Sequence, residues 1–176
     1  LVEKPKEPIG DLALVGVYMF GPQVFESVNR ITPSFRNELE ITDAIQWLVN
    51  QNRDVRFHTI TGWWKDTGRL EDLLEANRIL CDDFETRIDG YVDETSKIEF
   101  KVVIEKGARI QNSIIRGPSI IGKNTKIVDS YVGPFTAINH DCDIRESEIE
   151  HSIILEGSKI SQIHNRISDS LIGKNV

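Results

Sequence analysis

The sequence predicts an α/β segment followed by an all-β, left-handed parallel β-helix of hexapeptide repeats. Two observations predict this fold. Residues 1–85 alternate strand and helix patterns, whereas residues 86–176 carry apolar side chains at a period of five or six. A change in hydrophobic period along a chain marks a change of architecture. We therefore expect two domains, residues 1–85 and residues 86–176.

Two segments of the first domain have the pattern of strands. Residues 12–20 are apolar on both faces, which is typical of a central strand covered on each side. A Gly-Pro pair then ends the strand. Residues 55–60 alternate apolar and polar side chains, so they predict a second strand.

Two further segments have the pattern of helices. Residues 41–50 place apolar side chains at helical spacing, with Thr42 as the expected cap. A second apolar stripe predicts a helix from residue 67 to about residue 84, capped by Thr67 or Gly68. Strands that alternate with helices indicate an α/β domain.

Beyond residue 85 the helical pattern stops and short repeats begin. The recurring apolar positions are Ile98, Ile104, Ile110, Ile115, Ile121, Ile127, Val132, Ile138, Ile144, Ile149, Ile154 and Ile160. A tetrad of Asn, Asp or Glu, then Ser, then any residue, then Ile or Val occurs at 112–115, 129–132, 146–149 and 169–172. The first three copies follow one another at equal intervals, and the fourth follows after a longer one. The longer interval fits one coil plus one extra hexapeptide unit.

This period has a direct physical meaning. Each hexapeptide unit forms one short strand and a corner, and three units bring the chain back one rung higher. The Ile and Val side chains then stack into a core that no single coil could bury alone. Hexapeptide units of this kind coil left-handed, against the usual crossover handedness. A β-sandwich is the alternative, but sandwiches do not repeat a tetrad at the regular interval seen here.

Charge and composition exclude several classes of protein. The net charge is −7 and no run of Lys or Arg occurs, which argues against non-specific nucleic-acid binding. The longest apolar stretch is far shorter than the roughly 20 residues of a transmembrane helix. Only Cys81 and Cys142 are present, so a disulfide scaffold and a thiolate zinc site are excluded.

Glu3, Lys4 and Arg36 are candidates for binding a sugar phosphate. A carboxylate beside a lysine can bind a sugar hydroxyl and a phosphate side by side, although a solvated charge pair is the simpler interpretation. Arg36 precedes a predicted helix, and its planar fork suits a phosphate at the helix N-terminus. An ion pair with Glu38 or Glu40 is an equally good interpretation.

The segment Gly62-Trp63-Trp64-Lys65-Asp66-Thr67-Gly68 is more informative. Two adjacent tryptophans on a loop are costly unless at least one packs into something. Asp66 precedes a predicted helix, where a carboxylate can cap the helix or ligate a divalent cation. The four histidines are scattered without ligand spacing, and we interpret them as surface or corner residues.

Four motifs together resemble a known family. They are EKP at 3–5, DLALVGVYMF at 11–20, RNELEITDA at 36–44 and WWKDTG at 63–68. In this order they resemble the sugar-1-phosphate nucleotidyltransferases, and most of all the long-form glucose-1-phosphate thymidylyltransferases, whose C-terminal part is a left-handed β-helix. The resemblance implies that residues 1–85 are the C-terminal part of a Rossmann-like nucleotidyltransferase domain.

The resemblance also implies roles for individual residues. Glu3 would hydrogen-bond the glucose hydroxyls, and Lys4 and Arg36 would bind the sugar phosphate. Leu14 would lie against the sugar through its backbone, and Trp64 would line the sugar pocket.

The implied cofactor is Mg²⁺, with Asp66 as one of two carboxylate ligands, so that Lys4, Arg36 and Asp66 would be the catalytic residues. The implied reaction condenses dTTP with glucose 1-phosphate and releases pyrophosphate and dTDP-glucose. We expect a cytoplasmic homo-oligomer that binds neither membranes nor nucleic acids.

Two departures from the family pattern matter. Asn37 stands where many members have Gly, and Asn tolerates a left-handed backbone better than most residues. The family's Gly-rich triphosphate loop and its first Mg²⁺-binding aspartate are not among these 176 residues, and the chain opens at Leu1. We therefore expect a C-terminal fragment without activity of its own.

Two alternatives concern the β-helix. Left-handed β-helices also occur in acyltransferases, in which a histidine between coils activates an amine or a hydroxyl; His140 and His151 are the candidates. The β-helix can also be a non-catalytic prop or an oligomer contact.

Overall fold

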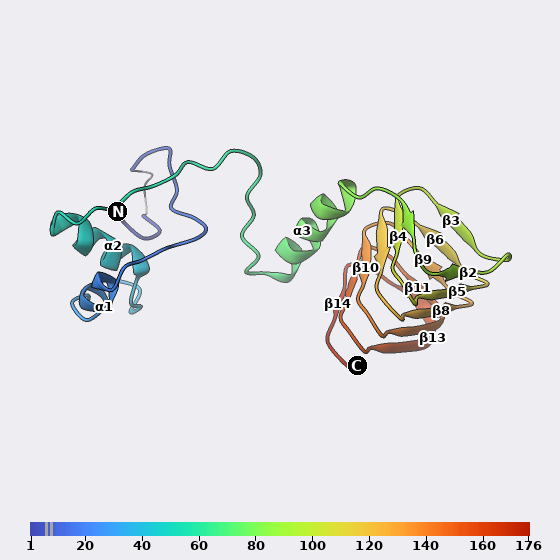
Figure 1. The fold of residues 1–176 in the computed structure, drawn as a ribbon. Coiled ribbons are helices and arrows are strands. Elements are labelled where there is room, and N and C mark those ends of the chain that lie inside the picture. Colours follow the sequence, from blue (N-terminus) through green and yellow to red (C-terminus); the bar gives the residue numbers. More distant parts are fainter. Residues whose placement is uncertain (6, 8) are drawn as a thin grey trace. The chain divides into compact units, whose positions relative to one another are not determined.

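A computed structural model describes residues 1–5, 7 and 9–176 of the chain (Figure 1). These residues form two compact units, Leu1–Gly62 and Trp63–Val176. The domain boundary expected at residue 85 stays a prediction. In the described part of the chain, no helix has the length and apolar character needed to cross a bilayer.

The first unit is built on two helices that pack against each other, α1 (Gln23–Val28) and α2 (Ile41–Asn50). The helix predicted at residues 41–50 is confirmed, and it buries the apolar face formed by Ala44, Ile45 and Leu48. The predicted cap is wrong. Glu40 is the N-cap residue, with an extended backbone, and Thr42 already lies inside the first helical turn.

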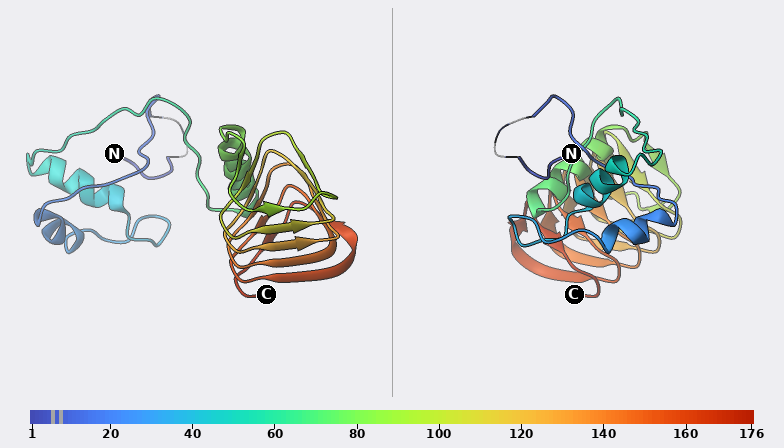
Figure 2. Two further views of the ribbon diagram at one scale, coloured as in Figure 1. Left: turned by 45° about the vertical axis from the view of Figure 1, so that its right-hand side comes forward. Right: turned by 90° about the vertical axis from the view of Figure 1, so that its left-hand side faces the viewer.

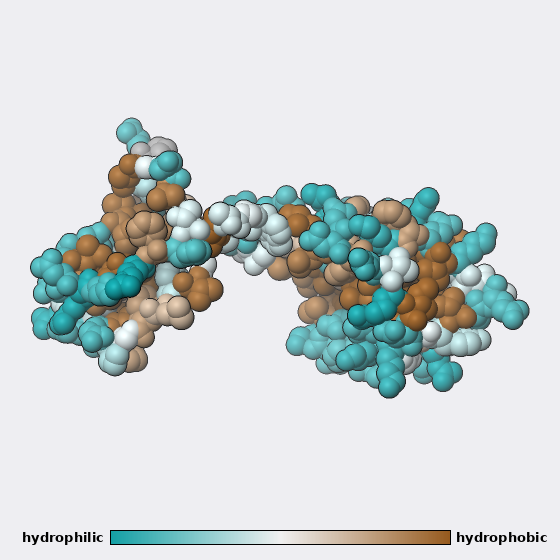
Figure 3. All heavy atoms as spheres, turned by 45° about the horizontal axis from the view of Figure 1, so that its top comes forward, coloured by the Kyte–Doolittle hydropathy of each residue, from teal (hydrophilic) through white to brown (hydrophobic). Residues whose placement is uncertain are grey.

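The strands expected at residues 12–20 and 55–60 are wrong for this structure, because the described residues there pair with no neighbour. A strand is stabilised by pairing its backbone N–H and C=O groups with a neighbouring strand, and without one these groups are hydrated and the segment is irregular. The apolar side chains are consequently exposed. The exposed fraction is 89% for Val17, 94% for Met19 and 80% for Phe57, and brown apolar side chains appear on the surface in Figure 3.

The second unit begins with helix α3 (Leu70–Asp82). A helix was predicted here, but its expected caps, Thr67 and Gly68, are wrong. Arg69 is the N-cap residue, and no side chain caps the helix. The helix starts later than predicted because residues 67–69 are not helical.

One face of α3 packs along the β-helix (Figure 2). Leu74 and Cys81 are buried on this face. The Asn77 side-chain amide donates a hydrogen bond of 2.8 Å to the carbonyl of Phe135, and Lys101 donates one of 2.6 Å to the carbonyl of Asp82. The helix therefore touches several successive coils.

The strands that follow are short and all pair in parallel. They are β1 (Arg87–Ile88), β2 (Tyr91–Val92), β3 (Lys97–Glu99), β4 (Val102–Ile104), β5 (Arg109–Gln111), β6 (Ile114–Arg116), β7 (Ser119–Ile121), β8 (Lys126–Val128), β9 (Tyr131–Val132), β10 (Thr136–Ile138), β11 (Asp143–Ile149), β12 (Ile153–Ile154), β13 (Lys159–Ile167) and β14 (Leu171–Ile172).

The strands form a parallel solenoid of about five turns. One sheet has the order β1-β4-β7-β10-β12-β14. The second has the order β2-β5-β8-β11-β9-β6-β3, with β13 beside β11. The long strand β11 pairs with both β8 and β9, so it turns a corner and joins two sides of the solenoid. The parallel β-helix predicted from the repeat is confirmed, and it is consistent with the left-handed coiling expected.

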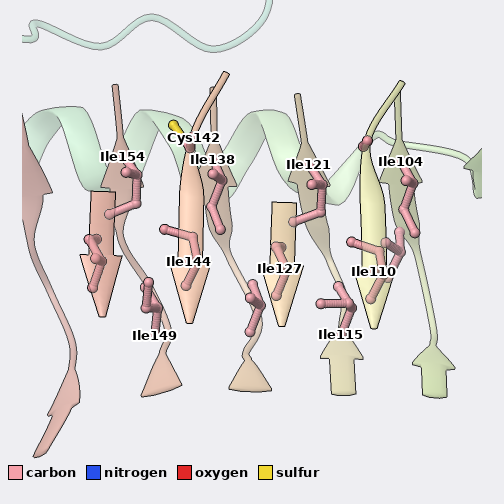
Figure 4. Packing of buried hydrophobic residues seen from close by; sticks show 14 residues of the cluster. Ile104, Ile110, Ile115, Ile121, Ile127, Ile138, Cys142, Ile144, Ile149 and Ile154 are labelled. Atoms are coloured by element: carbon pink, nitrogen blue, oxygen red, sulfur yellow. The ribbon is translucent and has the colours of Figure 1, made fainter. Parts of the chain in front are cut away.

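The core of the solenoid is the stack of repeating Ile and Val side chains (Figure 4). In-register partners recur at the interval of the tetrad, as in Ile110, Ile127 and Ile144. All of the predicted positions are buried except Ile98, which is partly buried against the same cluster. Burial of an isoleucine side chain contributes about 1.5–3 kcal/mol, and β-branched side chains fit this pleated surface.

The repeated tetrad explains one corner of the coil. Asn112, Asp129 and Glu146 have φ angles of 44°, 49° and 45°, a left-handed conformation that Asn and Asp tolerate best. The serine that follows each of them supports the next coil. The backbone N–H of Ser130 donates to Ser113 Oγ at 3.1 Å, and that of Ser147 donates to Ser130 Oγ at 3.3 Å.

The fourth copy of the tetrad lies at a different corner. There the backbone N–H of Ser170 donates to Ser152 Oγ at 3.1 Å, just before β14 begins at Leu171. The longer interval before this copy is thus one coil plus one further unit, as predicted.

Candidate functional site

Two of the predicted site residues, Glu3 and Arg36, lie together in the first unit. Arg36 Nη1 is 3.7 Å from Glu3 Oε1, and both side chains are about one quarter exposed. The Thr42 hydroxyl donates to Glu3 Oε2 at 3.3 Å. The first turn of α2 therefore helps to hold the Glu3 carboxylate beside the guanidinium.

Arg36 also contacts two further carboxylates. Its Nη2 is 2.8 Å from Glu38 Oε2, and its Nη1 is 3.3 Å from Glu40 Oε1. The ion pairs considered for Arg36 are therefore both present. Phosphate binding by Arg36 stays a prediction.

The loop before α2 shapes this cluster. The Ser34 hydroxyl donates to Glu40 Oε1 at 2.9 Å and accepts from the backbone N–H of Arg36 at 3.1 Å. Asn37 has a φ of 60°, so it adopts the left-handed conformation that an asparagine tolerates better than most residues. This turn brings the Glu38 and Glu40 side chains around the same guanidinium.

Lys4 and Leu14 are exposed in the first unit. Lys4 has a φ of 39°. No hydrogen bond or ion pair in the described residues holds the side chain of Lys4, and Leu14 is 42% exposed. Their predicted contacts with substrate stay predictions.

Trp64 and Asp66 belong to the second unit and flank a well-held lysine. Lys65 Nζ is 2.6 Å from Glu75 Oε2 and 2.9 Å from Asp72 Oδ1, both on α3. The hydrogen bond to Glu75 raises the pKa of Lys65, and the hydrogen bond from Lys65 lowers the pKa of Asp72. Lys65 therefore ties the loop to α3. Trp63 and Trp64 are both more than half exposed.

Asp66 has the chemistry of a metal ligand but is not a complete site. Within the described residues its carboxylate caps no helix and takes part in no hydrogen bond or ion pair. Carboxylate oxygens suit Mg²⁺, which proteins bind through one or two carboxylates together with substrate phosphates. The described residues contain no group of three His, Cys, Asp or Glu side chains placed to hold a metal ion. Asp66 thus has the chemistry of one Mg²⁺ ligand, and metal binding by it stays a prediction.

A separate groove of about 560 Å³ lies between α3 and the corner that precedes β12 and β14. It is lined by Leu70, Glu71, Leu74, Glu75, Arg78, His151 and Asp169. His151 Nδ1 lies 2.5 Å from Asp169 Oδ1, which belongs to the next coil. The rings of His151 and Phe135 are nearly perpendicular, with 6.2 Å between the ring centroids. His151 is therefore oriented by a carboxylate on one side and an aromatic ring on the other.

The two cysteines are buried and unpaired. Burial raises the pKa of the Cys81 thiol to about 11, and burial also raises the pKa of Cys142. A buried thiol with a raised pKa carries less thiolate at neutral pH than a free one, so neither residue has the surroundings of an activated nucleophile.

Comparison with known proteins agrees with the motifs. Residues 1–83 match the nucleotidyl transferase family model. The chain is 52% identical over all 176 residues to the glucose-1-phosphate thymidylyltransferase of Streptomyces griseus and 51% identical to that of Streptomyces antibioticus, covering 49% of each protein. The resemblance predicted from four motifs is confirmed.

A third relative carries a second activity in its name. The chain is 34% identical to the bifunctional sugar-1-phosphate nucleotidylyltransferase/acetyltransferase of Sulfurisphaera tokodaii, over all of this chain and 44% of that protein. The chain spans about half the length of the curated relatives it matches.

Sequence reasoning missed two features of the residues that match the nucleotidyl transferase family model. The first is the contact of Lys65 with Asp72 and Glu75. An acidic first turn on the helix after a loop lysine was the available signal. The second is the position of Glu40, which is the N-cap residue of α2 and whose buried side chain contacts Arg36. Nothing in a local pattern distinguishes a buried glutamate at this position from one that points into water.

Proposed function

We propose that this chain forms the sugar-phosphate side, and part of the metal site, of a glucose-1-phosphate thymidylyltransferase. The enzyme would join dTTP and glucose 1-phosphate to give dTDP-glucose and pyrophosphate. The observation that carries the proposal is the 52% identity, over the whole chain, to a protein of that name. The contact between Glu3 and Arg36 supports it, because it brings a sugar-binding carboxylate next to a phosphate-binding cation.

The chemistry needs alignment and charge more than covalent help from the protein. A phosphate oxygen of glucose 1-phosphate attacks the α-phosphorus of dTTP, and the bond from that phosphorus to the bridging oxygen breaks. Arg36 and Lys4 would neutralise the sugar phosphate and hold it in line for attack. Glu3 would accept hydrogen bonds from the glucose hydroxyls, while the Leu14 backbone and Trp64 would pack against the sugar.

Mg²⁺, when bound with Asp66 as one ligand, would offset the negative charge that accumulates on the phosphates. Asp66 suits this role because its carboxylate is exposed and is not already neutralised by a cation in the described residues. By contrast, the neighbouring Asp72 is already paired with Lys65.

The experiment compares Asp66→Asn with Asp54→Asn in the native protein that contains these residues. Asp54 is an exposed aspartate whose ion-pair partner among the described residues is the nearby Arg56, so its loss is a matched control. We expect Asp66→Asn to lower the kcat of pyrophosphate release about 100-fold or more, and Asp54→Asn to leave it unchanged. Equal activity of the two variants would contradict the role of Asp66, and no activity in the unsubstituted protein would contradict the function.

We expect the chain of residues 1–176 alone to be inactive. Its sequence contains no Gly-rich triphosphate loop, so nothing in it would orient dTTP. The measurement is dTDP-glucose formation by this purified chain. Formation at a rate near that of the native thymidylyltransferase would refute this expectation.

A second candidate function is acyl transfer at the groove beside α3. It is favoured by the His151–Asp169 pair, which lines that groove, and by the name of the Sulfurisphaera tokodaii relative. His151 would accept a proton from an amine as the amine attacks a thioester carbonyl; the C–S bond then breaks and the thiol leaves. His140 also pairs with an aspartate, Asp141, at 2.7 Å, but it does not line the groove.

The acyl-transfer test measures acetyl-CoA consumption with an amino-sugar phosphate. We expect any such activity to be lost in His151→Asn and kept in His140→Asn, with thymidylyl transfer unchanged in both. No acetyl-CoA consumption by the unsubstituted protein would remove this candidate.

We also propose that the β-helix acts as a rigid prop or oligomer contact of a cytoplasmic homo-oligomer. Light scattering of chains that end before and after Glu85 tests this proposal. A shorter chain of unchanged oligomeric state would contradict the oligomer contact and favour the prop, whereas a lower oligomeric state would support the oligomer contact.

A further inference from the structure

The guanidinium of Arg36 has two edges in different surroundings. Nη1 faces Glu40 at 3.3 Å and Glu3 at 3.7 Å, whereas Nη2 faces Glu38 at 2.8 Å. The Glu40 side chain is 9% exposed, and the Glu38 side chain is 56% exposed. The shorter contact is therefore the one open to water.

Glu40 is held in place by the chain around it. Its Oε1 accepts a hydrogen bond from the Ser34 hydroxyl as well as from Arg36 Nη1. Its backbone begins α2, which gives the carboxylate a position near the positive end of a helix of ten residues. A buried carboxylate with these partners has little freedom to move, so it fixes the Nη1 edge of Arg36.

Glu38 has no comparable support. Among the described residues its carboxylate contacts only Arg36, and an ion pair this exposed contributes about 0–1 kcal/mol because water and salt compete for both charges. A phosphate offers a guanidinium two parallel, charge-assisted hydrogen bonds and a higher negative charge. A phosphate can therefore replace the Glu38 carboxylate.

We propose that Glu40 is a positioning residue that anchors the Nη1 edge of Arg36, and that Glu38 occupies the Nη2 edge until the sugar phosphate displaces it. This inference rests on the proposed function, because it takes Arg36 as the ligand of the phosphate of glucose 1-phosphate. It deepens that function by giving opposite roles to two nearby glutamates that touch the same side chain.

The test is steady-state kinetics of Glu40→Gln and Glu38→Gln in the native protein that contains these residues. Each change removes one charge and keeps the size of the side chain, so each variant is the control for the other. We expect Glu40→Gln to raise the KM for glucose 1-phosphate about tenfold, because Arg36 is no longer held. We expect Glu38→Gln to lower the same KM about threefold, because a competitor is removed. The KM for dTTP should stay constant in both.

These readouts separate positioning from folding. Loss of folded protein lowers the apparent kcat but does not move the two KM values in opposite directions. If Glu40→Gln does not fold, Ser34→Ala takes its place, since it removes the hydroxyl that holds Glu40 and should also raise the KM for glucose 1-phosphate.

Different outcomes test the roles of Glu38 and Glu40 and the proposed thymidylyltransferase function. Normal turnover with both KM values for glucose 1-phosphate unchanged, or shifted in the same direction, would overturn the inference alone. No turnover of glucose 1-phosphate by the unsubstituted protein would overturn the proposed function and this inference with it.

Discussion

Both units of this chain contain segments with apolar strand patterns, but only one unit buries their apolar side chains. In Trp63–Val176 the repeating isoleucines are buried; Ile115, for example, has no exposed surface. In Leu1–Gly62 the apolar residues of 12–20 and 55–60 are mostly exposed, and Met19 is 94% exposed. Figure 4 shows the first arrangement and Figure 3 shows apolar side chains at the surface.

The difference lies in where the partner strand comes from. A strand of the β-helix pairs with a strand one coil further along the chain, as Ile98 pairs with Ile115, so each coil supplies the cover for its neighbour. The segment 12–20 has no such neighbour among the described residues. The strand pattern of residues 12–20 is therefore not sufficient for a strand, because no partner strand lies among the described residues.

The largest expected effect comes from the core of the repeat. Ile115→Ala should lower the free energy of unfolding of the second unit by about 2–5 kcal/mol, because it leaves a cavity in a fully buried stack. Ile114→Ala is the matched control on the same strand, β6, where the side chain is 39% exposed. It should cost less than about 1 kcal/mol. Urea unfolding followed by circular dichroism measures both, and equal losses would show that the inward stack does not carry the stability.

The corner serines should give a smaller effect. Ser130→Ala should cost about 1–3 kcal/mol, because the buried backbone N–H of Ser147 loses its acceptor. The matched control is Ser119→Ala. The Ser119 hydroxyl is buried, and no hydrogen-bond partner for it occurs in the described residues, so its removal should be neutral or slightly stabilising. The same urea titration compares the two variants. A larger loss of unfolding free energy in Ser119→Ala would contradict the inference that the Ser130 hydroxyl stabilises the next coil.

The first unit should respond in association rather than stability. Replacing Val17 and Met19 together by Ser removes exposed apolar surface, so concentration-dependent light scattering should fall while the unfolding of the β-helix stays unchanged. Tyr91→Ser is the control, because it removes an exposed apolar side chain from the second unit. If Tyr91→Ser lowers the scattering as much as the double substitution does, the exposed segment 12–20 is not what drives association.

Most of the β-helix could be predicted because its signal is periodic. The tetrads revealed the coil length, and the spacing before Asp169 even located the extra unit. The candidate site could be predicted from the sequence only in part. Glu3 and Arg36 do lie together, but that contact joins residues far apart in the sequence, and only the resemblance suggested it. The carboxylate Glu40 was missed as a positioning residue because its role depends on burial, which no local pattern records.

The contacts of α3 have a consequence for how the solenoid comes apart. Stacked coils that touch only their neighbours tend to fray from the ends, one rung at a time. Here a single helix is bonded to residues ahead of β4 and β10 through Asp82 and Asn77, and it shares a groove with Asp169 ahead of β14. Helix α3 therefore connects coils from near the start of the β-helix to near its end. Coils that are far apart in the stack should therefore unfold together. Unfolding of this unit should then be more cooperative than its repeating architecture alone would predict.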